Sequence, residues 1–107
     1  MKKRYGSGLI GTTATQIVGC GPEESITINR IWVCNTSGSN RTFTLHHTPT
    51  GESPADSNLV ISGEQIQTGV SKQYEGPVYL RPGEQLWALA DAVDVVNVFA
   101  HAEVSAV

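Results

Sequence analysis

Long hydrophobic runs are missing from this sequence. No segment approaches the ~18 consecutive apolar residues that cross a bilayer as a helix. The start, MKKRYGSGLIG, carries charge but has no apolar run of signal-peptide length. Apolar residues with a helical period of 3.6 are also missing over any useful length. We therefore expect a protein without membrane spans or a secretory leader, kept inside the cell that makes it until it is assembled or released.

Basic residues are scarce. The 107 residues include 7 Lys and Arg against 10 Asp and Glu, for a net charge of -3. A protein that neutralises nucleic-acid phosphates needs a surplus of positive charge, so the composition argues against a nucleic-acid binder. Three of the seven basic residues, Lys2, Lys3 and Arg4, stand at the N-terminus. We expect a flexible basic arm over residues 1–11 and a single acidic domain over residues 12–107; the arm is either a disordered terminus or docks on an acidic neighbour.

Cysteine is nearly absent, with Cys20 and Cys34 the two in the chain. If Thr13–Cys20 and Ser25–Cys34 pair as adjacent strands, the two cysteines lie roughly 30 Å apart at ~3.3 Å per residue. A disulfide requires Cα atoms within about 7 Å of each other. The sequence therefore predicts two unpaired thiols.

Recognisable catalytic motifs are missing as well. No Ser or Cys stands in a nucleophile elbow, and no glycine-rich loop suits a phosphate. His46-His47 with the following Glu52 is similar in part to the metal motif of cupin-type jelly-roll metalloenzymes. Neighbouring residues on a strand point to opposite faces, however, and the one other histidine, His101, is distant in sequence. A metal site is therefore not predicted.

Two acidic residues, Asp91 and Asp94, bracket a tight turn and are candidates for an acid–base pair or a calcium site. No third acidic residue is near them in sequence, and Asp commonly caps its own backbone in turns. We predict no catalytic, cofactor-binding or metal-binding residues, no cofactor, and a protein that is not an enzyme.

What the sequence does contain is a series of short apolar or alternating runs between turns rich in its 11 Gly and 5 Pro residues. This pattern predicts an all-β fold, an antiparallel β-sandwich of jelly-roll-like type with about eight strands. The expected strands are Thr13–Val18, Ser25–Cys34, Thr42–His47, Leu59–Ile61, Gln65–Lys72, Pro77–Leu80, Gln85–Ala90 and Val95–Val104.

The central element is Ser25–Thr48, in which two apolar-patterned runs flank the polar cluster Asn35–Asn40. Small polar residues between two such runs predict a β-hairpin. The apolar parity slips within the first run, so Asn29-Arg30 is the expected site of a β-bulge that restores the inward face.

Four aromatic residues, Trp32, Trp87, Tyr74 and Tyr79, suggest either a sugar-stacking platform or core packing. The two tryptophans lie within apolar strands, which favours the core. The final strand, Val95–Val104, carries apolar residues on both faces. Such a strand is either central and covered on both faces or buried against a sister copy, and the second reading predicts a homo-oligomer.

Four segments carry a resemblance to a known family: Ile31–Gly38, Thr42–Leu45, Leu80–Ala88 (Leu-x-Pro-Gly-Glu-x-Leu-x-Ala) and Val95–Val104. Together they resemble small β-sandwich virion proteins of tailed bacteriophages. The resemblance implies a virion structural protein, most of all a capsid decoration (cement) protein that stabilises the shell through protein–protein contacts. A neck, tail or fibre component, including a carbohydrate-binding module for the host surface, is the alternative.

The same resemblance implies the protein's partners and its place. The partners are phage structural proteins, either the major capsid protein or neck and tail proteins, together with sister copies. A trimer is favoured, because decoration proteins of this kind often sit on three-fold positions. The expected location is the virion, assembled in the cytoplasm of the bacterial host. The family brings no catalytic residues with it.

Overall fold

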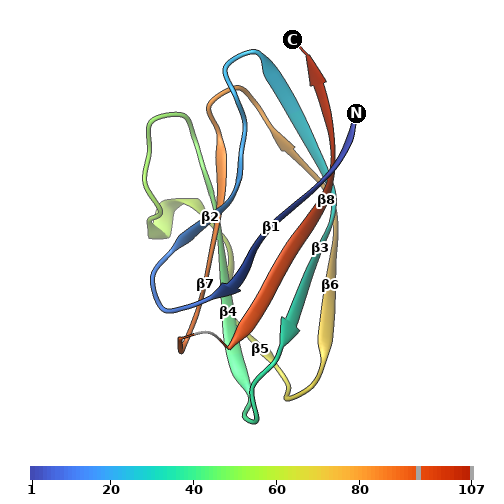
Figure 1. The fold of residues 1–107 in the computed structure, drawn as a ribbon. Coiled ribbons are helices and arrows are strands. Elements are labelled where there is room, and N and C mark those ends of the chain that lie inside the picture. The colour runs from blue at the N-terminus through green and yellow to red at the C-terminus, as the bar shows by residue number, and fades with distance from the viewer. Residues whose placement is uncertain (94, 107) are drawn as a thin grey trace.

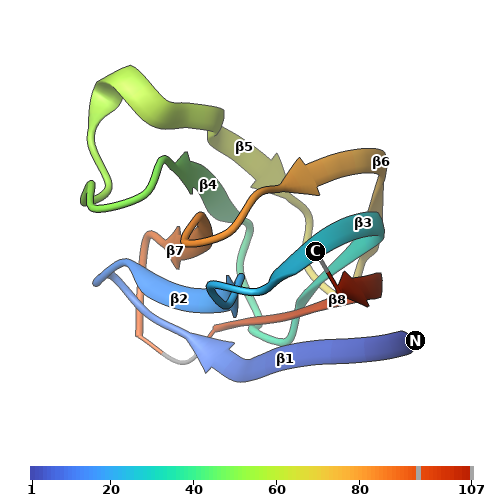
Figure 2. The ribbon, with the colours of Figure 1, turned by 90° about the horizontal axis from the view of Figure 1, so that it is seen from above.

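Eight strands form two four-stranded antiparallel sheets in the computed structural model, which describes residues 1–93 and 95–106. Sheet A has the strand order β1-β8-β3-β6, and sheet B has the order β2-β7-β4-β5. Seen from above, the two sheets lie as two layers, one on each side of the core (Figure 2). This strand order is that of a jelly roll, built from two Greek keys. The predicted fold class is confirmed.

Figure 1 shows the course of the chain through the eight strands. A 3-10 turn, η1, lies at Asp56–Asn58 before β5. Among the described residues no helix has the length and apolar character needed to cross a membrane. In chain order the strands are β1 Lys2–Ile10, β2 Thr15–Gly19, β3 Glu24–Asn35, β4 Arg41–Thr48, β5 Leu59–Ile66, β6 Ser71–Leu80, β7 Gln85–Ala90 and β8 Val96–Ala106.

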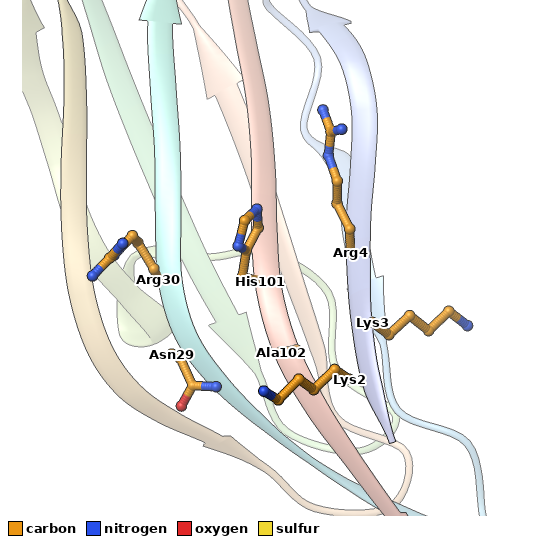
Figure 3. Close-up of a pocket in the computed structure, with 7 residues that line it drawn as sticks. All are labelled: Lys2, Lys3, Arg4, Asn29, Arg30, His101 and Ala102. Atoms are coloured by element: carbon orange, nitrogen blue, oxygen red, sulfur yellow. The ribbon is translucent and has the colours of Figure 1, made fainter.

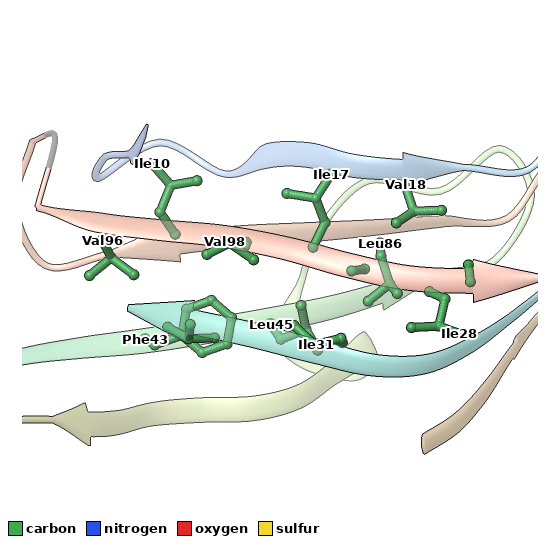
Figure 4. Packing of buried hydrophobic residues seen from close by; sticks show 14 of the residues in the cluster. Ile10, Ile17, Val18, Ile28, Ile31, Phe43, Leu45, Leu86, Val96 and Val98 are labelled. Atoms are coloured by element: carbon green, nitrogen blue, oxygen red, sulfur yellow. The ribbon is translucent and has the colours of Figure 1, made fainter. Parts of the chain in front are cut away.

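The core lies between the two sheets, where every second residue of the central strands is buried (Figure 4). β-branched and large apolar side chains fill it at close to complete burial. Burial of such side chains is the main favourable contribution to folding. The most fully buried large side chains include Ile28, Val33, Phe43, Leu45, Leu86 and Val98.

The predicted β-bulge is present in β3. The pairing register shifts between Ile28 and Arg30 against both neighbouring strands, β6 and β8. The shift lets Ile28 and Ile31 both face the core, although they are an odd number of residues apart, and both are buried. The bulge prediction is confirmed.

The predicted hairpin is wrong. β3 belongs to sheet A and β4 to sheet B, so the segment between them is an arch that crosses from one sheet to the other. The side chain of Asn35, 1% exposed, holds this arch. Its amide nitrogen donates to the carbonyl oxygens of Ser39 at 2.8 Å and Ile66 at 2.9 Å, and its Oδ1 accepts from the Ser37 N–H at 2.9 Å. These side-chain hydrogen bonds hold the segment in place of the backbone hydrogen bonds that would join two strands of a hairpin.

The expected pairing of Thr13–Cys20 with Ser25–Cys34 is also wrong, because β2 pairs with β7 and β3 pairs with β6 and β8. Both cysteines are nevertheless free, as predicted. Cys20 follows β2 in sheet B, and Cys34 lies near the end of β3 in sheet A. The connection between the two strands therefore crosses between the layers instead of forming a tight hairpin.

The expected flexible arm over residues 1–11 is a strand instead. Lys2–Ile10 forms β1, which pairs with β8 along its length with one register shift, between Gly6 and Gly8. The Met1 amino group donates to the Val104 carbonyl oxygen at 2.8 Å, and Ile10 is buried against the core. Backbone hydrogen bonds hold this segment, so its basic side chains and its glycines do not prevent strand formation. The domain therefore includes residues that the sequence suggested were outside it.

The expected polar strand Gln65–Lys72 is interrupted by a turn. β5 ends at Ile66 and β6 begins at Ser71, and between them Gly69 has a φ of +71°, a conformation that glycine adopts readily. β6 then runs unbroken to Leu80, so the expected separate strand Pro77–Leu80 is the last part of a longer one. A turn follows β6 at Arg81–Glu84, where the Glu84 N–H donates to the Arg81 carbonyl oxygen.

Candidate functional site

The outer face of sheet A carries an aromatic pair. Trp32 on β3 and Phe99 on β8 are register partners, and their rings stack at a centroid distance of 6.1 Å and an interplanar angle of 19°. The residues on either side of each ring are buried in the core, so strand alternation places both rings outside. Trp32 is half-buried there, and the prediction that it belongs to the core is wrong.

Three cationic or titratable side chains flank this pair. The Arg4 guanidinium lies 4.3 Å from the centroid of the Phe99 ring, and the Arg30 guanidinium lies 5.9 Å from the Trp32 ring. The His101 ring is 5.9 Å from Phe99. Cations over aromatic faces are attracted by the ring quadrupole. We call Arg4, Arg30, Trp32, Phe99 and His101 the aromatic–cationic cluster; it crosses three adjacent strands, β1, β8 and β3.

A shallow hollow of about 620 Å³ adjoins the cluster on the same face (Figure 3). Its lining holds four of the seven Lys and Arg residues of the chain and no acidic residue. Two acidic groups lie close by: Glu75, whose Oε1 is 3.3 Å from Arg30 Nη2, and Glu103, 3.7 Å from the Met1 amino group. We call this the basic hollow; it is lined by Lys2, Lys3, Arg4, Asn29, Arg30, His101 and Ala102.

The other aromatic residues do not join the cluster. Trp87 lies half-buried in sheet B and not in the predicted core, and its Nε1 donates to Thr48 Oγ1 at 3.1 Å. Tyr74 packs against the core with its ring 6.0 Å from that of Phe43, and burial raises the pKa of its hydroxyl. Tyr79 is 64% exposed on β6. The four aromatic residues considered from the sequence therefore form no single platform.

A second, smaller cavity of about 210 Å³ opens between β5 and β6, where each strand is the edge of its sheet. Apolar side chains form most of its lining, including Ile28, Ile31, Leu45 and Val60, with Tyr74 and Glu75 at one side. The cavity can hold a small apolar group. Its two titratable groups are the Tyr74 phenol and the Glu75 carboxyl, and no serine or cysteine is among the residues that line it.

The two adjacent histidines point to different surroundings. His46 is buried, with Nδ1 2.9 Å from Asn58 Oδ1 and 3.1 Å from the Ala55 carbonyl oxygen, so it anchors the loop between β4 and β5. His47 Nε2 lies 3.1 Å from Glu84 Oε1. Glu52 is exposed, and His101 belongs to the other sheet. Within the described residues no group of three or more His, Cys, Asp or Glu side chains is placed to hold a metal ion.

Asp91 is exposed, and Asp94 lies outside the described residues.

The Glu84 carboxyl has a pKa below its ordinary value of 4.5. Partial burial raises the pKa, but the hydrogen bond from the Arg81 N–H at 2.9 Å and the contact with His47 more than offset that effect. The carboxylate thus helps to close the turn between β6 and β7 and to position His47.

Glu84→Gln is expected to reduce the loss of stability in acid. A carboxyl whose pKa falls on folding stabilises the protein above its unfolded pKa, and this contribution is lost as the pH falls through its folded pKa. The wild type should therefore lose stability relative to the variant as the pH falls below about 4.5. Urea unfolding at neutral pH and at stepwise lower pH measures the difference, and parallel curves for the two proteins would contradict the assignment.

The aromatic–cationic cluster was missed by sequence reasoning. A signal was available within each strand, since Arg30 and Trp32 alternate with inward residues, as do Phe99 and His101. The sequence does not show that β1, β8 and β3 are neighbours in one sheet, and this order is what brings the five side chains together. Function must be inferred from the fold, this face and the sequence pattern, because no protein-family model, no curated protein and no solved structure matches the chain.

Proposed function

We propose that this protein is a bacteriophage virion structural protein without enzymatic activity, most of all a capsid decoration protein that binds the assembled shell. The observation that carries the proposal is the aromatic–cationic cluster on the outer face of sheet A. Tryptophan, aromatic rings in general and arginine are enriched at the energetic centres of protein–protein interfaces. A strand face that displays such residues away from its own core is suited to a protein partner.

The ring geometry favours a protein partner over a sugar. A sugar-stacking platform needs an open aromatic face. Here the Trp32 and Phe99 rings face each other, and guanidinium groups lie over both. These contacts leave less open ring face on which a sugar could stack. A carbohydrate-binding module on a tail or fibre is therefore the weaker proposal.

The fold adds support by analogy alone. Jelly rolls of two four-stranded sheets occur in viral capsid proteins, but also in lectins and cupins. Leu80–Ala88 and the other three segments resemble small phage virion proteins. This resemblance favours a viral structural role over that of a lectin or a cupin. A protein that binds only the assembled shell stabilises that state by mass action.

The homo-oligomer is a prediction of the resemblance alone. β8 is not an edge strand: it lies between β1 and β3, with its inner residues buried in the core. The apolar character of the final strand is thus accounted for within one chain. A trimer remains the favoured size, and the neighbouring copies and the major capsid protein remain the proposed partners within the virion.

Particles with and without this protein test the proposed function. We expect particles that lack it to release their DNA at a lower temperature, and purified protein added back to bind them and restore the release temperature. Trp32→Ala should weaken this binding about tenfold or more, as expected for an aromatic residue at the centre of an interface. Trp87→Ala, the same change on sheet B, is the matched control and should bind normally.

Two results would overturn the proposal. One is absence of the protein from purified particles. The other is equal thermal stability of particles with and without it.

A further inference from the structure

We infer that the basic hollow binds a carboxylate-rich segment of a partner protein. The inference rests on the proposed function, because it names the chemistry by which the outer face of sheet A would recognise its partner. It concerns Lys2, Arg4, Arg30 and His101, which line the hollow on three adjacent strands.

The charge distribution is the first argument. The chain has a net charge of -3, yet four of its seven Lys and Arg residues line this one hollow, although the side chain of one of them, Lys3, points away from it. Of the other three, Lys72 forms an ion pair with Glu64, and Arg41 and Arg81 lie on other elements. A local positive region on an acidic protein attracts an acidic partner, and it sets the orientation in which that partner binds.

The placement of the donors is the second argument. Arg4 lies over the Phe99 ring, which restricts the guanidinium and leaves N–H groups at its edge. Arg30 Nη2 lies 3.3 Å from Glu75 Oε1, and its Nε is buried without a hydrogen-bond partner, so a ligand would meet the exposed part of the guanidinium. In Figure 3, Lys2 extends across the hollow toward Asn29, whereas Lys3 points away. The hollow therefore presents several donors with few acceptors of its own.

The chemistry of these donors selects the ligand class. The planar fork of a guanidinium matches a carboxylate, with which it forms two parallel hydrogen bonds. Nucleic acid offers a long track of phosphates, whereas the basic region here is a single hollow on a protein with ten acidic residues. The covered ring faces leave no platform for bases or sugars. A segment containing several Asp or Glu residues fits best.

The test uses a fluorescent oligo-glutamate peptide and the full-length protein, with binding followed by fluorescence anisotropy. We expect binding at low salt that falls as salt is added, because exposed charges are screened. Arg4→Gln should weaken binding about tenfold, the size of one well-placed charged contact. Arg81→Gln removes the same charge from the exposed turn after β6 and should leave binding unchanged.

A second variant guards against an indirect effect of Arg4 on the packing of Phe99. Lys2→Gln removes a charge from an exposed side chain of the hollow, whereas the cations over the two rings are Arg4 and Arg30, and it should also weaken binding. Unchanged thermal unfolding of each variant shows that the fold is intact.

Three results would overturn the inference: no binding of oligo-glutamate at low salt, equal weakening by Arg4→Gln and Arg81→Gln, or tighter binding of a DNA oligonucleotide or a sulfated polysaccharide than of oligo-glutamate. The proposed function fails separately. Particles that bind the protein while oligo-glutamate does not would support the virion role and reject this site. Oligo-glutamate binding with no protein on particles would support the site and reject the virion role.

Discussion

Phe43→Ala is expected to lower the free energy of unfolding by about 4 kcal/mol, as large-to-small changes at a fully buried phenylalanine do. Phe43 is the third residue of β4 and has no exposed surface, and its ring is 6.0 Å from that of Tyr74 across the core. Removing the ring loses the free energy gained by burying it and leaves a cavity between the two sheets. Because the core is closely packed, the surrounding side chains can fill this cavity only in part. A domain of this size has a total stability of roughly 5–15 kcal/mol, so the loss is a large share.

Denaturant unfolding followed by tryptophan fluorescence measures this effect. Val60→Ala is the matched control, because Val60 lies on the neighbouring strand β5 but is 51% exposed. The control should change stability by no more than about 0.5 kcal/mol. A loss of less than about 1 kcal/mol for Phe43→Ala would mean that the ring is not a central part of the core.

Gly76→Ala is expected to cost about 3 kcal/mol, the upper part of the range for overpacking. A Cβ added to Gly76 would lie 2.2 Å from the Ile28 carbonyl oxygen and 2.9 Å from the Val78 nitrogen. Both are backbone atoms of the paired strands β3 and β6. The clash therefore cannot be relieved by the movement of a side chain. The strands must separate locally or shift register next to the bulge.

Gly38→Ala provides the control for this prediction. Gly38 lies in the arch between β3 and β4, and a Cβ there would meet no atom within 4 Å. Its substitution should leave stability nearly unchanged, or raise it slightly, because alanine reduces the conformational entropy of the unfolded chain. Denaturation midpoints of the two variants, measured side by side, give the comparison. Equal midpoints would contradict the close approach of β6 to β3 at Gly76.

Local pattern was enough to predict most strands and their inward faces. The alternation in β7 gave its bounds correctly, and the parity slip in β3 indicated the bulge at Asn29-Arg30. Such features depend on neighbouring residues alone, because successive side chains on a strand point to opposite faces. The same alternation placed Trp32 outside the core, but its size and apolar neighbours favoured the wrong interpretation.

The candidate site was beyond sequence reasoning for a different reason. Arg4, Phe99 and Trp32 are close only because β8 lies between β1 and β3. The basic N-terminal residues suggested a free arm, since β1 has few apolar residues to mark it as a strand. Its pairing with β8 depends on backbone N–H donors, which every residue except proline has, and on carbonyl acceptors, which every residue has, so this pairing leaves no mark in the sequence.

By itself the sequence determined that this chain is an all-β sandwich, which residues alternate inward along most strands, and where the bulge and several turns lie. Only the tertiary structure decided which strands share a sheet. Asn35–Asn40 has the composition of a hairpin turn, yet Asn35 bonds across to Ile66 and the chain crosses to the other layer. Which strands pair depends on how apolar faces far apart in the chain pack together. The basic hollow and the aromatic pair beside it follow from that pairing.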